Sequence, residues 1–197
     1  MGKAERTKEF IIQKTAILFN KKGYAGTSLT DMTDATGLTK GSIYGNFEDK
    51  DDVALAAFDH NMNKLIGQVR EIQVSERSAA GKLRAFITVY RNGAQSPVLQ
   101  DGCPIINTGS EADDTHPQLK ERANEALGRW HKSILAIIQQ GKMQGEFREN
   151  ANASEFASLM ISLIEGGSAL SKMSGDGNYL TKSLDHLETL ISTQLKK

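Results

Sequence analysis

Apolar residues recur at helical spacing along most of the chain, and glycine or proline separates the successive segments. Such stripes of apolar residues predict helices over 6–22, 83–94, 117–145, 156–170 and 180–195. The clearest stripe has apolar positions alternately three and four residues apart and predicts one long helix after Lys50: Leu55, Phe58, Met62, Leu65, Val69 and Ile72. The pattern therefore predicts an all-α protein.

Residues 28–47 predict two short helices joined by a tight turn. Ser28 and Asp31 have the spacing of a capping box at the start of the first helix. Gly37 stands where a glycine in the left-handed conformation would end that helix. Thr39 is placed to cap the second helix, in which Ile43 and Phe47 form an apolar i, i+4 pair.

The other side chains of the second short helix are small or polar, as in a helix that reads the major groove of DNA: Lys40, Gly41, Ser42, Tyr44 and Asn46. A helical hairpin inside an ordinary all-helical core has the same spacing. The preceding segment favours DNA binding, because residues 1–27 hold six Lys or Arg and two acidic residues. The whole chain has zero net charge, so the affinity for DNA must come from this local patch.

Composition excludes several other classes of protein. One cysteine allows no internal disulfide and fits a reducing cytoplasm. No apolar run approaches the roughly 20 residues that span a bilayer, so we expect no membrane partner. No phosphate-binding loop or metal-ligand spacing occurs, so we expect no cofactor, no metal and no catalytic residue.

Four runs in the first part of the chain carry a resemblance to a known family. They are Phe19-Asn-Lys-Lys-Gly-Tyr24, Thr27-Ser28, Thr36-Gly-Leu-Thr-Lys-Gly-Ser-Ile-Tyr44 and Phe47-Glu-Asp-Lys50. Together they resemble the N-terminal domain of the TetR/AcrR family of bacterial transcriptional regulators. The resemblance implies a three-helix DNA-binding domain over 1–50, with its recognition unit at 28–47. A larger helical regulatory, ligand-binding and dimerisation domain then fills 51–197, with about nine helices in total.

The resemblance implies a homodimeric repressor that a small-molecule effector releases from a palindromic operator in double-stranded DNA. Position in the motif assigns phosphate contacts to Thr27 and Ser28 at a helix N-terminus, and a phosphate anchor to Lys50. The residues expected at the base edges and the adjoining phosphates are Thr39, Lys40, Gly41, Ser42, Tyr44 and Asn46. The alternatives are a solvated surface charge for Lys50 and a core ring for Tyr44.

Effector control must come from the middle of the chain. A cavity between helices that holds a small molecule needs apolar walls and a few polar groups, and we expect these from Tyr90, Cys103, Ile106, Asn107, His116, Trp130 and Ile134. The alternative for Tyr90 and Trp130 is that both rings belong to the core.

Cys103 admits two interpretations. A lone cysteine beside Pro104 and Ile105 is usually a small buried hydrophobe. The segment from Gly102 to Asn107 also resembles a Gly-Cys-Pro subgroup of the family in which this thiol senses oxidants or electrophiles, and a cation such as Lys172 would favour the thiolate. An all-helical enzyme using Cys103 and His116 lacks an identifiable third partner. A helical interaction module would leave the polar face of residues 39–46 unexplained.

The last two predicted helices have wide apolar faces. The resemblance implies a homodimer in which two helices from each subunit form a four-helix bundle. The residues expected at this interface are Phe156, Met160, Leu163, Gly167, Leu187 and Ile191; the alternative is core packing within one chain. A twofold dimer would place its two recognition helices about 34 Å apart on DNA.

Overall fold

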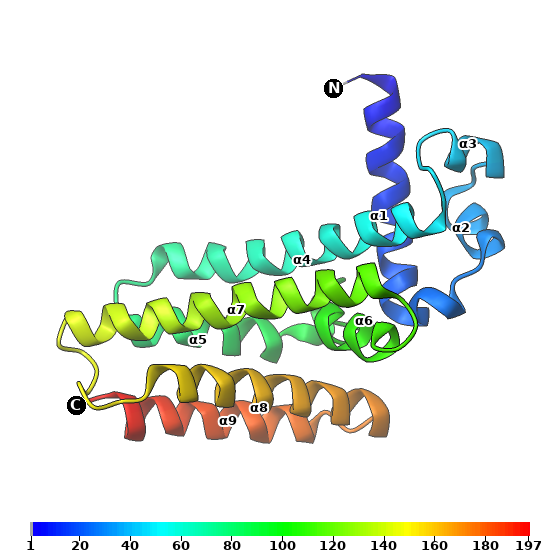
Figure 1. Cartoon of the computed structure of the whole chain (residues 1–197). Coiled ribbons are helices and arrows are strands. Elements are labelled where there is room, and N and C mark those ends of the chain that lie inside the picture. Colours follow the sequence, from blue (N-terminus) through cyan, green and yellow to red (C-terminus); the bar gives the residue numbers. More distant parts are fainter. Residues whose placement is uncertain (1) are drawn as a thin grey trace. The chain divides into compact units, whose positions relative to one another are not determined.

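The computed structural model describes residues 2–197 and confirms the all-α prediction (Figure 1). Its described part contains nine α-helices and a final π-helical turn at Ile191–Leu195. The helices are α1 (Lys3–Gly26), α2 (Leu29–Thr36), α3 (Lys40–Tyr44), α4 (Lys50–Ser75), α5 (Ala79–Arg91), α6 (Pro104–Ala112), α7 (Pro117–Met143), α8 (Ala153–Ser174) and α9 (Asn178–Leu190).

The chain divides into two compact units. The first unit contains Met1–Lys64 and Pro104–Asn124, and the second contains Leu65–Cys103 and Glu125–Lys197. These units differ from the expected division after residue 50. Local sequence pattern shows where a helix begins, but α6 joins the N-terminal helices through contacts between residues far apart in the chain.

The local signals of the predicted helix-turn-helix are confirmed within the first unit. Ser28 and Asp31 form the capping box of α2, and Gly37 ends that helix with φ 68°. The Thr39 hydroxyl accepts the backbone N–H of Ser42 at the start of α3. Ile43 and Phe47 are buried, so the apolar pair anchors α3 while its polar side stays outside.

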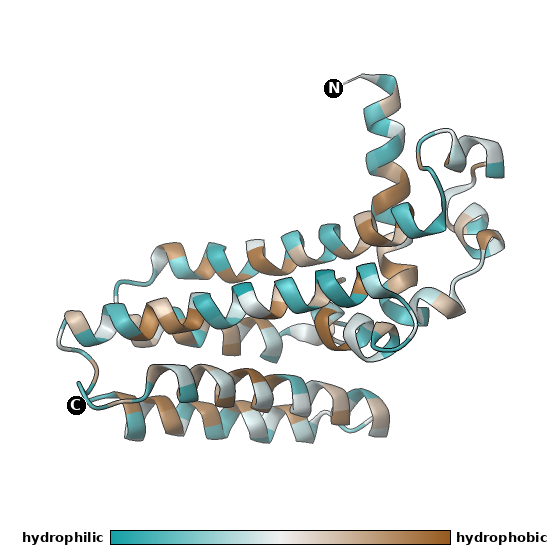
Figure 2. Cartoon of the chain, viewed as in Figure 1, coloured by the Kyte–Doolittle hydropathy of each residue, from teal (hydrophilic) through white to brown (hydrophobic). Residues whose placement is uncertain are grey.

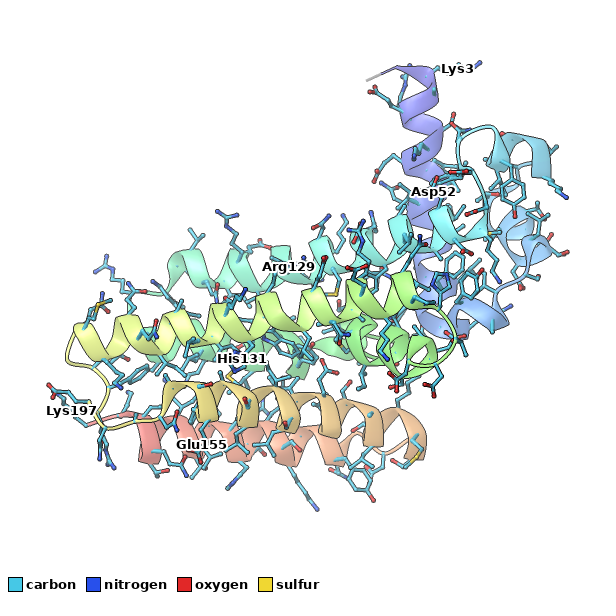
Figure 3. The ribbon with its side chains drawn as sticks, in the orientation of Figure 1. Lys3, Asp52, Arg129, His131, Glu155 and Lys197 are labelled. Atoms are coloured by element: carbon cyan, nitrogen blue, oxygen red, sulfur yellow. The ribbon has the colours of Figure 1, made fainter. Side chains whose placement is uncertain are left out.

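Helices α8 and α9 lie side by side and run in opposite directions in the second unit (Figure 1). Gly167 allows this close approach, because a Cβ added there would lie 3.0 Å from the Cα of Leu180. In Figure 3 the side chain of His131, on α7, points toward the first turns of α8. Its Nε2 lies 3.3 Å from the backbone oxygen of Ser154 and 3.3 Å from the Ser158 hydroxyl.

Candidate nucleic-acid interface

The exposed surface of α3 has the expected chemistry. Lys40 and Gly41 are exposed in the first turn of the helix, and Ser42 is half-buried. A Cβ added to Gly41 would meet no atom closer than 4.0 Å, where the Thr39 hydroxyl lies. Glycine lowers helix stability by about 1 kcal/mol relative to alanine. Since packing within the chain does not require Gly41, its small size is available for close approach of another molecule.

Thr27 and Ser28, which were expected to bind a DNA phosphate together, have different surroundings at the start of α2. Thr27 is fully buried, and its hydroxyl donates to the backbone oxygen of Gly23 at 2.7 Å. That hydroxyl is therefore already hydrogen-bonded inside the protein. This corrects the expectation that it binds a DNA phosphate. Ser28 is exposed, although its hydroxyl also donates to the carboxylate of Asp31.

Asp31 links this helix start to the basic end of α1. The ammonium of Lys22 lies 2.5 Å from one Asp31 oxygen, and Ser28 donates to the other. These hydrogen bonds, first the one from Lys22, hold the pKa of the Asp31 carboxyl well below its usual range. Asp31 therefore stays ionised at neutral pH and partly offsets the positive charge of the segment.

Lys50 stands at the start of α4 with its Nζ 4.2 Å from the centre of the Tyr24 ring, a cation–π contact. The Tyr24 hydroxyl donates to the Asp51 carboxylate, and this bond is the main cause that raises the pKa of Tyr24 to about 12. Tyr24 therefore remains neutral and holds the first turn of α4, from which Lys50 projects.

Tyr44 and Asn46 are half-buried at the end of α3. The Asn46 amide donates to the backbone oxygen of Ser42 at 2.8 Å, so its nitrogen closes the end of the short helix. Its side-chain oxygen has no such bond within the helix.

Three residues expected at the effector site meet in the second unit. The Tyr90 hydroxyl lies 3.1 Å from the Cys103 sulfur, and the rings of Tyr90 and Trp130 stack with centroids 5.7 Å apart. Ile134 is fully buried one turn farther along α7. Ile106, Asn107 and His116 lie in the first unit, and their place in one effector cavity with these residues stays a prediction.

Those three residues have structural roles in the first unit. The Asn107 amide donates to the side-chain oxygen of Asn20 at 2.9 Å. His116 caps α7, since its Nδ1 accepts the backbone N–H of Leu119, and its ring packs edge-on against Tyr24. Ile106 is half-buried in the first turn of α6.

The sequence interpretation missed Glu165, which joins the Tyr90–Cys103–Trp130 cluster from α8. The Tyr90 hydroxyl donates to its Oε1 at 3.3 Å, whereas its Oε2 is buried with no hydrogen-bond partner among the described residues. Burial raises the pKa of the Glu165 carboxyl from 4.5 to about 7. An acid between Ile164 and Gly166 in an apolar stripe was the available signal.

The surroundings of Cys103 do not favour a reactive thiolate. Its side chain is 0% exposed, and the neighbours identified are a tyrosine hydroxyl and a carboxyl group. Negative charge nearby disfavours a thiolate. Lys172, expected as a cation near this thiol, is exposed on α8. The buried-hydrophobe interpretation therefore fits the geometry better than the sensor interpretation.

The expected dimer residues divide into two groups. Leu163 is half-buried, whereas Phe156, Met160, Gly167, Leu187 and Ile191 are buried within the single chain. The core-packing alternative holds for these five, since a side chain already buried offers no surface to a partner. The apolar side chains left exposed on α8 and α9 are Leu159, Leu170, Met173 and Tyr179.

No group of histidine, cysteine and acidic side chains in residues 2–197 is arranged to hold a metal ion. Within the same range, none of the helices combines the length and the apolar character needed to cross a membrane.

Comparison with known proteins identifies the family. A family model described as bacterial regulatory proteins, tetR family, matches residues 11–57. A second, described as Tetracyclin repressor-like, C-terminal domain, matches residues 79–187. The chain belongs to the TetR family of transcriptional regulators. It is therefore a DNA-binding regulator of transcription and not an enzyme.

Related TetR-family proteins match most or all of the chain. A regulator from Cytophaga hutchinsonii is 40% identical with a TM-score of 0.91, covering 100% of this chain and 98% of its own. One from Chloroflexus aurantiacus is 37% identical with a TM-score of 0.93, covering 100% and 99%. The HTH-type transcriptional repressor KstR2 of Rhodococcus jostii is 31% identical over 76% of this chain and 71% of its own.

Proposed function

We propose that this TetR-family regulator is a homodimeric repressor that binds a palindromic operator and leaves it when a small molecule binds the second unit. The exposed surface of α3 carries the DNA part of the proposal. It combines a lysine, an N-capped helix start and a glycine that internal packing does not require. The repressor name of KstR2 supports repression as the outcome.

The two lysines beside α3 test the operator contact. Lys50→Ala should weaken binding to all DNA sequences and reduce the slope of log K against log salt concentration by about 0.9, because one phosphate contact is lost. Lys40→Ala should change the preferred sequence, because it removes a contact to a base edge. Fluorescence anisotropy with the DNA upstream of the chain's own gene, and with random DNA, measures both effects.

Lys182→Ala is the matched control, since Lys182 is exposed on α9 in the second unit. It should leave affinity and salt slope as in the unmodified protein. Equal losses from Lys40→Ala on operator and random DNA would contradict the proposed division of roles.

We infer the dimer surface from the apolar residues that the chain leaves exposed. The exposed Leu159, Leu170 and Met173 and the half-buried Leu163 follow helical spacing on one side of α8, and Tyr179 lies in the first turn of α9. Figure 2 shows that hydrophobic residues recur along α8 and α9. An exposed apolar stripe on a helix pair marks a protein–protein contact. A second copy of the same stripe would complete a four-helix bundle.

Leu170→Arg should convert the dimer to a monomer, because it places a charge in the apolar stripe. Sedimentation at micromolar concentration measures the change. Met143→Arg is the control, because Met143 is 82% exposed near the end of α7, away from the stripe. A dimer that persists in Leu170→Arg, or an unmodified chain that sediments as a monomer, would reject this surface.

The effector proposal rests on two buried atoms of the second unit that lack partners. They are Oε2 of Glu165 and the indole Nε1 of Trp130, which flank the stacked ring of Tyr90. A carboxylate beside aromatic rings suits an organic amine, and the indole N–H suits an acceptor on the same ligand. Trp130 is the chain's single tryptophan, so its emission should shift when such an amine binds and not when the corresponding alcohol is added.

A further inference from the structure

Helix α1 is interrupted at Gly23, six residues before α2 begins at Leu29. Gly23 has φ 75° and ψ 178°, which glycine adopts without a Cβ penalty. The helical turn that restarts after it begins with Tyr24 and Ala25. Their backbone N–H groups are in the position of those at any helix start, where no carbonyl of the same helix precedes them.

Glu111 of α6 supplies the missing acceptors. Its Oε2 accepts the N–H of Tyr24 at 2.7 Å, and its Oε1 accepts the N–H of Ala25 at 2.8 Å. The two bonds join residues more than 80 positions apart, and both partners lie in the first unit. A Cβ at Gly23 would lie 2.3 Å from Glu111 Oε2, so the glycine also makes room for the carboxylate. Glu111 thus acts as an N-cap supplied by another helix.

The capped turn holds two parts of the DNA-binding surface. The Tyr24 ring lies under the Lys50 ammonium, and its hydroxyl binds Asp51 in the first turn of α4. The Thr27 hydroxyl donates a hydrogen bond to the backbone oxygen of Gly23, and the next residue, Ser28, caps α2. The position of this turn therefore sets both the phosphate anchor and the start of the helix-turn-helix.

We propose that Glu111 is a positioning residue for DNA binding, which fixes Lys50 and the start of α2 by capping the Gly23 turn. This inference rests on the proposed operator binding. It means that a residue of α6, outside the family's N-terminal match at 11–57, helps to hold the helix-turn-helix in position. Glu111 itself contacts no DNA in this proposal; it acts through Tyr24.

The salt dependence of DNA binding distinguishes this role from general stabilisation. Glu111→Gln should weaken binding to the DNA upstream of the gene about 10-fold, since the charge is lost and an NH2 donor replaces one of the two acceptor oxygens. It should also lower the salt slope by about 0.9, as expected for Lys50→Ala. Adding Lys50→Ala to Glu111→Gln should then change the slope little further. Glu111→Asp, which keeps the carboxylate on a shorter stem, should give a smaller loss.

Amide hydrogen exchange tests the cap without DNA. Tyr24 and Ala25 should exchange about 10-fold faster in Glu111→Gln. Asp114→Asn, which removes an exposed carboxylate just after α6, should alter neither exchange nor DNA binding. An unchanged salt slope, or unchanged exchange at the two amides, would overturn the proposal. If the unmodified protein binds no DNA at any salt concentration, the proposed function fails, while the exchange result still decides whether Glu111 caps the turn.

Discussion

Replacing Gly41 by alanine is expected to raise the free energy of unfolding by about 0.5–1 kcal/mol and to weaken operator binding about 10-fold. The two effects have opposite signs because they have different causes. An alanine in the first turn of α3 restricts the unfolded chain and meets no atom within 4.0 Å in the folded protein. The same methyl group would occupy space that a base edge needs.

Chemical denaturation measures the first effect, and fluorescence anisotropy with operator DNA measures the second. Gly67→Ala is the matched control, since Gly67 is exposed within α4 and a Cβ there would meet nothing within 4 Å. It should raise stability by a similar amount and leave DNA binding unchanged. If Gly41→Ala binds the operator as tightly as the unmodified protein, α3 does not approach the bases at this residue.

Replacing Glu165 by glutamine should change how stability depends on pH. Burial raises the pKa of the folded carboxyl to about 7, against 4.5 for an ordinary glutamate. Below pH 4.5 both folded and unfolded states are protonated, so the group costs nothing. Between pH 4.5 and 7 only the unfolded state ionises, and stability is lost as pH rises. The difference amounts to about 3 kcal/mol above pH 7.

Glutamine does not ionise, so Glu165→Gln should gain about 3 kcal/mol relative to the unmodified protein between pH 4.5 and pH 8. Its amide oxygen still accepts the Tyr90 hydroxyl. Urea unfolding at several pH values measures the difference, and Glu149→Gln, an exposed residue before α8, should show no such gain. Parallel stability curves for Glu165→Gln and the unmodified protein would show that the Glu165 carboxyl is not desolvated.

The sequence predicted the helix-turn-helix closely because its determinants are local. The capping box at Ser28, the left-handed Gly37 and the Thr39 cap each depend on groups within four residues. The periodic apolar stripes likewise predicted the long α4 and the final pair of helices. In each case a short-range hydrogen bond or one side of a helix is encoded by neighbouring residues, so no knowledge of distant contacts is needed.

Residue types alone did not predict which apolar helix faces are buried within one chain and which remain exposed. Phe156 and Leu187 have the spacing of an interface, yet both are buried within one chain. The same pattern leaves Leu170 and Met173 outside. An apolar stripe predicts that one side of a helix will be buried. It does not predict which element will cover that side, because the hydrophobic effect is non-directional.

By itself, the sequence determined the family, the all-α fold and the surface of α3. Only the tertiary structure revealed that Thr27 is buried, that Glu165 joins Tyr90 and Cys103, and that Glu111 caps the turn after Gly23. Each of these depends on hydrogen bonds or burial between residues distant in the chain. Such contacts are fixed by the packing of whole helices, which no local pattern of residues specifies.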